Sequence, residues 1–211
     1  MNIHYRIDFF SDWHCGSGLS AGVDLDALVV KDKNELPFIP GKTIKGLVRE
    51  AVEELARLSE NVLVDDGNVA KENVQVSEQE QADKLKKEFD PIKKAFGFFK
   101  KDNNNLEIEV EKGKCFFSNA TIPHALANVV ISEKTAKYFY RTISSTKINE
   151  NGVAEEHSLR KIQVTIPCSL EGDILHVPDE MVETLKEGLK FIKRLGLNRN
   201  RGLGRCRIEV I

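Results

Sequence analysis

DLDALVVKDKNELPFIPGKTIKGLVRE, residues 24–50, is the stretch around which the rest of the chain is organised. It opens with two aspartates one residue apart, Asp24 and Asp26. The later segment Leu36–Gly41 contains two prolines and cannot be helical, because each proline restricts the residue before it. We therefore expect an extended turn that ends at Gly41.

A helix is predicted to follow this turn, over Lys42–Ser59. Its apolar residues recur at helical spacing, while Lys42, Lys45 and Arg49 form a cationic face. The first N–H groups of a helix are unpaired, so the start of this helix favours a phosphate. The alternative is a solvated amphipathic helix after a proline turn.

Length and composition describe an ordinary globular protein, which we expect to be one domain, residues 1–211. A chain of 211 residues can bury one good core or two small ones, and its hydrophobic content of 41% and charged content of 30% are ordinary for a globular protein. No apolar run approaches the roughly 20 residues that span a bilayer, so we expect a cytoplasmic protein with no membrane partner. The four cysteines have no close pair, which favours reduced structural thiols over a zinc site, although His14 and Cys15 could contribute to an assembled one.

The charges are unevenly distributed although the net charge is only −2. Gly188–Ile208 carries seven basic residues and no acidic one, whereas Ala51–Asp90 is strongly acidic. Residues 61–105 include a polar segment poor in aromatics, which predicts an insertion or mobile region. Nucleic-acid contact is therefore expected locally, near the C-terminus, rather than through bulk charge.

The order of the expected elements indicates an α+β protein with a ferredoxin-like (RRM-like) core and insertions. Ile3–Phe9 alternates apolar and polar residues and reads as a half-buried strand. The other expected elements are helices at 82–96 and 179–195 and strands at 106–110, 114–122 and 204–211.

Residues 140–166 predict a long β-hairpin. Asn149–Gly152 is a strong turn signal between two strand-like runs.

The C-terminal loop GLNRNRGLGR, residues 196–205, is the best nucleic-acid signal in the chain. Its glycines let the backbone approach a partner closely, and its arginines offer planar forks for phosphate oxygens. The alternative is that the glycines only permit a tight helix–strand connection. The candidate residues are Gly196, Arg199, Arg201, Gly202, Gly204 and Arg205.

Two separated motifs carry a resemblance to a known family. LPFIPGKTIKGLVR, residues 36–49, resembles the "PxIPGSSLKGxLR" signature of the RAMP proteins of CRISPR systems, and the Gly/Arg loop resembles their second motif. The resemblance implies an RRM-like fold in which the helix after the first motif lines a guide-RNA groove. It also implies that the hairpin at 140–166 protrudes as a thumb that presses on the guide–target duplex, although Asn149 replaces the usual aspartate. The RNA-contacting residues implied outside the Gly/Arg loop are Lys42, Thr43, Lys45, Arg49 and Lys147.

Asp26 is the candidate catalytic residue. In the target-cleaving backbone subunit of type III complexes an aspartate stands in this loop, followed six residues later by another, and Asp26 and Asp32 reproduce that spacing. A carboxylate beside a scissile phosphate can hold a divalent cation, here Mg²⁺, or orient a 2′-hydroxyl attack. One carboxylate is not a complete active site, and the alternative is an Asx-turn aspartate.

The leading interpretation is a guide-RNA-binding backbone subunit of a type III CRISPR effector that cleaves target RNA through Asp26. One alternative is a structural RAMP subunit that does not cleave. Another is a CRISPR RNA-processing endoribonuclease with His14 as base, although a histidine bonded into its loop is the simpler interpretation. The implied partners are guide RNA, target RNA, other copies of this chain, other RAMP subunits, small subunits and the large polymerase/cyclase-like subunit.

Overall fold

The computed structural model describes residues 1–20, 25–62, 91–101 and 108–211. Asp24 and most of the predicted insertion at 61–105 lie outside these residues. Within the described part of the chain, no helix is long and apolar enough to cross a membrane.

The fold is built on an antiparallel sheet in the order β10-β1-β9-β6-β2, with β5 also paired to β9. Strand β1 spans Ile3–Phe9, and every second residue is buried because one face of the strand packs on the core. Strands β9 and β10 flank it on either side. The remaining bounds are β2 Phe38–Ile39, β5 Phe116–Phe117, β6 Ala120–Thr121, β9 Ser169–Leu175 and β10 Cys206–Val210.

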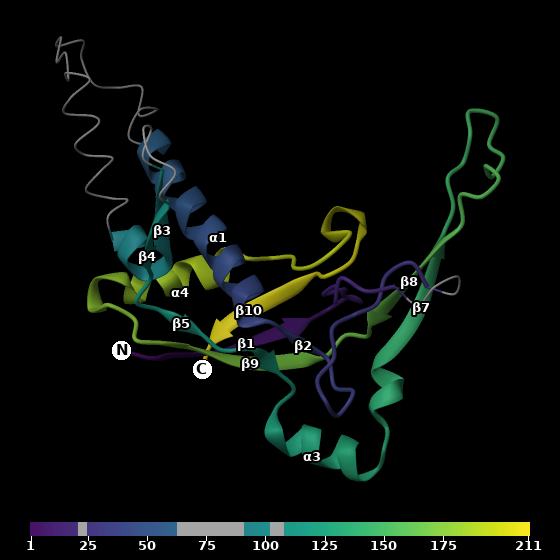
Figure 1. The fold of residues 1–211 in the computed structure, drawn as a ribbon, viewed down its shortest axis with the longest axis horizontal. Helices are drawn as coiled ribbons and strands as arrows, with labels where there is room; N and C mark the ends of the chain where they lie inside the picture. The colour runs from purple at the N-terminus through teal and green to yellow at the C-terminus, as the bar shows by residue number, and fades with distance from the viewer. Residues whose placement is uncertain (21–24, 63–90, 102–107) are drawn as a thin grey trace.

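Two helices, α1 (Gly41–Val62) and α4 (Val182–Phe191), lie together on one face of this sheet (Figure 1). Helix α1 turns Ile44, Val48 and Val52 to the core, one helical turn apart, and α4 contributes Leu185 and Leu189. The core elements follow one another in the chain as β1, α1, β6, β9, α4 and β10. Of these four strands, β1 and β9 lie in the middle of the sheet. The α+β ferredoxin-like core predicted from the sequence is therefore confirmed.

Several element boundaries differ from the sequence-based expectations. Residues 91–96 are helical, and Ile92, Ala95 and Phe96 belong to the core, so the C-terminal part of the predicted 61–105 insertion is an integral part of the fold. The strand expected at 114–122 is split into β5 and β6. Helix α4 begins after a short 3₁₀ turn, η2 (Asp179–Met181), and ends at Phe191 rather than Leu195.

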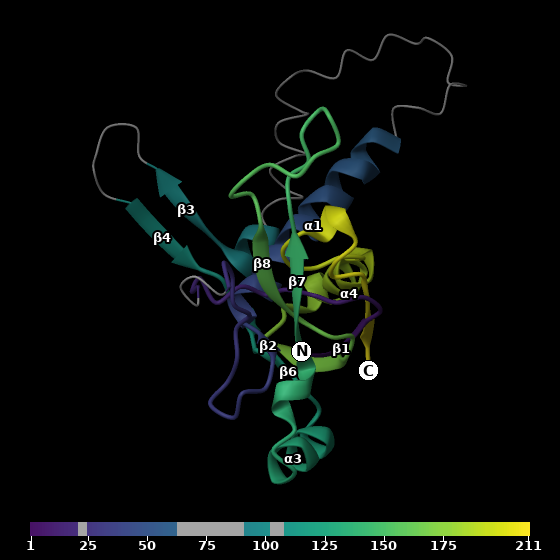
Figure 2. The same ribbon diagram turned by 90° about the vertical axis from the view of Figure 1, so that its right-hand side faces the viewer.

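Two hairpins project from opposite ends of the sheet (Figures 1 and 2). One pairs β3 (Gly97–Lys101) with β4 (Ile108–Lys112). The other pairs β7 (Tyr140–Ser145) with β8 (Arg160–Thr165), inside the range predicted as a hairpin. Its end is closed by Asn149, whose side-chain oxygen accepts hydrogen bonds from the N–H groups of Asn151 and Val153, each at 3.0 Å.

A helical insertion connects the sheet to the β7–β8 hairpin. It consists of α3 (His124–Ser132) and the 3₁₀ turn η1 (Ala136–Phe139). Helix α3 lies beyond the sheet on the side away from α1 in both ribbon views (Figures 1 and 2). This insertion places the hairpin at one end of the core.

Candidate nucleic-acid interface

The segment Asp12–Cys15, directly after β1, is the point where the candidate loops meet. All four of its side chains are buried, including the two polar ones, Asp12 (6% exposed) and His14 (2% exposed). Burial of an aspartate is costly unless the carboxylate is paired. We call this segment the central segment.

The Gly/Arg loop packs against the central segment through its backbone. The N–H of Leu197 donates to the carbonyl of His14 (2.9 Å), and the N–H of Gly204 donates to that of Asp12 (2.7 Å). A side chain at residue 196 would collide with the His14 carbonyl, and both Gly196 (φ 97°) and Gly204 (φ 68°) have left-handed backbones. Gly196 and Gly204 therefore permit a tight connection between α4 and β10, which was the alternative interpretation of the glycines in this loop.

The base of the β7–β8 hairpin is tied to the same segment. Trp13 and Thr165 exchange both backbone hydrogen bonds, at 2.9 and 2.8 Å. The Nδ1 atom of His14 lies 2.6 Å from the carbonyl oxygen of Gln163. The guanidinium of Arg141 donates from Nε to the Asp12 carboxylate at 2.6 Å and also contacts it through a terminal nitrogen, which pairs the buried charge.

Asp26 lies beside the hairpin as well. Its N–H donates to the carbonyl of Lys161 (2.8 Å), and its Oδ2 accepts the Lys161 N–H (2.7 Å), so β8 holds both its backbone and its side chain. The side chain of Asp26 is exposed. The Asx-turn proposed as an alternative for Asp26 is instead formed by Asp32, whose Oδ1 accepts the N–H groups of Asn34 and Leu36 at 2.8 Å each.

The start of α1 offers fewer unpaired N–H groups to a phosphate than expected, because three of them are bonded within the protein. The N–H of Gly41 donates to Oδ1 of Asn119 at 2.9 Å, and those of Thr43 and Ile44 donate to the carbonyl of Pro40. Gly41 is also buried against the backbone of Phe117, where a side chain would collide. The protein itself caps this helix.

The predicted RNA-contacting residues of α1 differ in how accessible they are. Arg49 is engaged within the protein, since its guanidinium contacts Glu53 at 2.7 Å and the Gly97 carbonyl at 3.3 Å. Lys42 is exposed, while Thr43 is half-buried. Lys45 is half-buried. Burial raises the pKa of the Cys115 thiol, and the positive charge of Lys45 partly offsets that rise.

The arginines of the Gly/Arg loop are accessible. The 3₁₀ turn η3 (Arg199–Arg201) stands out from the core next to β10 (Figure 1), and Arg201 and Arg205 are exposed. Arg199 lies 3.6 Å from Glu50 of α1. A side chain at Gly202 would meet open space, although its backbone is left-handed (φ 93°).

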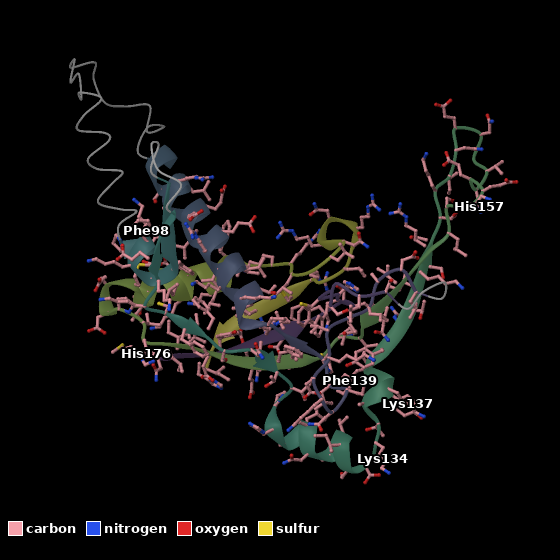
Figure 3. All side chains as sticks on the ribbon, in the orientation of Figure 1. Phe98, Lys134, Lys137, Phe139, His157 and His176 are labelled. Carbon is pink, nitrogen blue, oxygen red and sulfur yellow. The ribbon has the colours of Figure 1, made fainter. Side chains whose placement is uncertain are left out.

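Lys147 lies on the outer part of the hairpin, far from the Gly/Arg loop in sequence. Its Nζ pairs with Glu155 across the hairpin at 2.9 Å, and the Lys147 side chain is 72% exposed while that of Glu155 is half-buried. The labelled His157 marks the same outer part of the hairpin (Figure 3). Lys147 therefore does not share a site with the central segment.

Sequence reasoning missed Asp12, Trp13 and Arg141, and also a groove at the base of the hairpin. The groove has a volume of about 520 Å³ and lies between α3, β7 and the 31–35 loop. Lys134 and Lys137 line it and mark its α3 side in Figure 3. The available signal was the run of polar and aromatic residues directly after a predicted strand.

The described residues do not fit a complete divalent-cation site. No group of three or more His, Cys, Asp or Glu side chains within them could hold a metal ion, and Asp26 has one carboxylate oxygen already bonded to Lys161. The cysteines are free thiols. Burial raises the pKa of Cys15 and of Cys206 to about 11, so these thiols stay protonated near neutral pH.

The sheet order, the two helices on one face and the arginine loop between α4 and β10 define an α+β ferredoxin-like protein with a cationic loop beside its sheet. The family model of the RAMP superfamily matches residues 6–207, so the chain belongs to this superfamily. The curated proteins contain no match to it.

Solved structures with a similar fold come from Type III-B Cmr-beta. A chain of the cryo-EM structure bound to cognate target RNA has a TM-score of 0.63 and 11% sequence identity, and the match covers 100% of this chain and 97% of that chain. A chain of the apo-state structure has a TM-score of 0.58 with the same identity and coverage. At this identity the likeness shows the fold.

Proposed function

We propose that this protein is a guide-RNA-binding backbone subunit of a type III CRISPR effector complex. Its RAMP fold and its likeness to chains of a Type III-B complex that binds target RNA support this role. The partners in this proposal are guide RNA, target RNA, further copies of the chain, other RAMP subunits, small subunits and the large polymerase/cyclase-like subunit. A cytoplasmic location follows from the same role.

One observation carries the proposal. The central segment bonds simultaneously to the Gly/Arg loop and to the β7–β8 hairpin, while β8 also holds the Asp26 loop. Segments far apart in sequence thus come together with exposed Arg201 and Arg205 on one side and exposed Asp26 on the other. This arrangement suits a chain that grips an RNA backbone by phosphate contacts beside a carboxylate.

Asp26 is proposed to act on the target RNA through its Oδ1 atom, for which no hydrogen bond is found among the described residues. The carboxylate would accept the proton of a 2′-hydroxyl, whose oxygen attacks the adjacent phosphorus. The bond to the 5′ oxygen then breaks, and that oxygen takes a proton from solvent. The products would be a 2′,3′-cyclic phosphate and a 5′-hydroxyl. A dependence on Mg²⁺ remains part of the proposal only if RNA or a neighbouring subunit supplies the other ligands, and no step above needs it.

The two alternatives are affected differently by the geometry. His14 is 2% exposed and its Nδ1 is bonded to Gln163, which disfavours the processing endoribonuclease in which it would be the base. The structural subunit that does not cleave shares every RNA contact proposed here. It therefore stays the second candidate, favoured by the incomplete ligand set around Asp26.

The first test measures binding of a CRISPR guide RNA over a range of salt concentrations. Replacement of Arg199, Arg201 and Arg205 together by alanine is expected to weaken binding strongly and to reduce the slope of log K against log salt by about 0.7 for each lost phosphate contact. The matched control removes three exposed cations near the β3–β4 end of the molecule. They are Arg57, Lys94 and Lys112.

The control has the same change in net charge, so it separates a local contact from bulk attraction. Equal losses in the two triple variants would contradict the assignment of the Gly/Arg loop. Parental binding by the loop variant at every salt concentration would do the same.

A further inference from the structure

Phe10 is an exposed aromatic residue at the end of β1. The alternation of β1 buries Phe9 and turns Phe10 to the sheet face that α1 and α4 leave open, where 49% of it is exposed. An exposed phenylalanine forgoes the stabilisation that burial of its ring would give the fold. Its position beside charged groups therefore suggests a role in binding.

Two guanidinium groups flank the Phe10 ring. Those of Arg205 and Arg207 each lie 5.9 Å from its centroid. The backbone fixes this arrangement, because the N–H of Phe10 donates to the carbonyl of Arg205 (2.8 Å) and the N–H of Arg205 donates to Oγ of Ser11 (2.9 Å). The aromatic ring and the last arginine of the Gly/Arg loop thus form one unit.

The charges around this unit favour an anionic partner. Arg207 pairs with Glu209 at 3.2 Å, and Asp8 is engaged by Arg6 at 3.3 Å and by Ser169 at 2.6 Å. No ion pair is found for Arg205 among the described residues. An aromatic face with an adjacent unpaired guanidinium matches a nucleotide, which offers a flat base to the ring and a phosphate to the cation.

We propose that Phe10, with Arg205 and Arg207, is a stacking site for one unpaired base of single-stranded RNA. The site deepens the proposed function, on which it rests, by extending the RNA path from the Gly/Arg loop onto the open sheet face. Base stacking is tolerant of sequence, so this site contributes affinity without selecting a guide.

The test compares Phe10→Leu with Phe10→Trp by anisotropy titration of a labelled single-stranded RNA. Phe10→Leu keeps an apolar side chain but removes the aromatic face, and its Kd is expected to rise roughly 5- to 100-fold. Phe10→Trp is expected to bind at least as tightly as the parent. Since the lost contact carries no charge, the salt dependence of Phe10→Leu stays parental, whereas that of Arg205→Ala becomes shallower.

Phe116→Leu is the matched control, because Phe116 is 57% exposed on the same sheet face and no flanking arginine is found for it among the described residues. It is expected to bind RNA like the parent. Parental affinity of Phe10→Leu would overturn the stacking site while leaving the proposed function intact. Absence of RNA binding by the parent would overturn both. If Phe10→Leu instead keeps its RNA affinity and loses association with protein subunits, Phe10 is a protein contact and the inference is wrong.

Discussion

At the scale of single residues, Asp26 has the geometry of a held but accessible carboxylate. Replacing it by asparagine keeps an oxygen that can accept the Lys161 N–H, so the free energy of unfolding is expected to change by less than about 1 kcal/mol. RNA binding should persist. Cleavage of complementary RNA by the assembled complex is expected to fall by about 10²–10⁴-fold, the usual contribution of a general base.

Asp32→Asn is the control for this variant. It removes the same charge six residues later, and asparagine keeps the Asx-turn oxygen that bonds Asn34 and Leu36. Gel analysis should show parental cleavage for Asp32→Asn and intact target for Asp26→Asn. Cleavage at the parental rate by both variants would make this chain a structural subunit.

The Asp12–Arg141 pair gives a prediction of stability. Arg141→Ala leaves a buried carboxylate without its main partner, and the free energy of unfolding is expected to fall by about 1–3 kcal/mol. Arg141→Lys should be intermediate, since one ammonium cannot reproduce contacts from two nitrogens. Urea unfolding followed by circular dichroism measures both. An Arg141→Ala variant as stable as the parent would mean that solvent replaces the arginine.

At this scale the sequence located some residues and missed their partners. Asp26 was found from the family resemblance, through its six-residue spacing to Asp32, but nothing local links it to Lys161, which is 135 positions away. Asp12 was overlooked because its burial depends on Arg141, 129 positions further along. Arg49 was expected to contact RNA. Its pair with Glu53 is a local contact four residues along α1, whereas its bond to the Gly97 carbonyl requires the β3–β4 hairpin to be in place.

At the scale of elements, the outer half of the β7–β8 hairpin is separable from the core. Its apolar residues Ile148, Val153 and Leu159 are each about 60% exposed. Replacing residues 147–158 by Asn-Gly would close the strands with a two-residue turn. We expect the free energy of unfolding to change by under about 1 kcal/mol, while engagement of target RNA weakens and binding of guide RNA persists.

Native mass spectrometry of the complex with and without target RNA would measure this. Insoluble protein would show that the outer hairpin contributes to the core. Unchanged target engagement would contradict its role as a thumb.

Elements with a clear period could be predicted, and those that owe their form to neighbours could not. The alternation of β1 and the helical spacing of α1 are local signals. Strand β9 was not identified, although its polar and buried residues alternate, because a glycine, Gly172, stands at one of the buried positions. Gly172 makes room there for the ring of Tyr5. Helix α3 was also missed, since HALANVVIS has no charged face to set a helical period.

At the scale of the whole molecule, the buried thiols predict a loss of stability at alkaline pH. Burial raises the folded-state pKa of Cys15 and Cys206 from 9.0 to about 11 and that of Cys168 to about 12. The unfolded chain therefore releases these protons first. The stabilisation is complete below about pH 9 and is lost as the pH rises toward 11 to 12.

Urea unfolding at pH 7, 9 and 10.5 would show this decline. The variant in which Cys15, Cys168 and Cys206 are all replaced by alanine should start less stable, but its stability should fall less over the same range. A parental curve that is flat to pH 10.5 would show that the thiols ionise in the folded protein.

The attachment of Asp26 to β8 has a mechanical consequence. Because Lys161 of β8 bonds both its backbone and its carboxylate, Asp26 is attached to the hairpin and not to the central sheet. A displacement of the hairpin would therefore displace Asp26 as well, whereas the backbone of the C-terminal loop is bonded to residues 12–15. In the proposed role, the arginines and the aspartate would then contact RNA from two separately held parts of the molecule, which meet where Trp13 bonds Thr165.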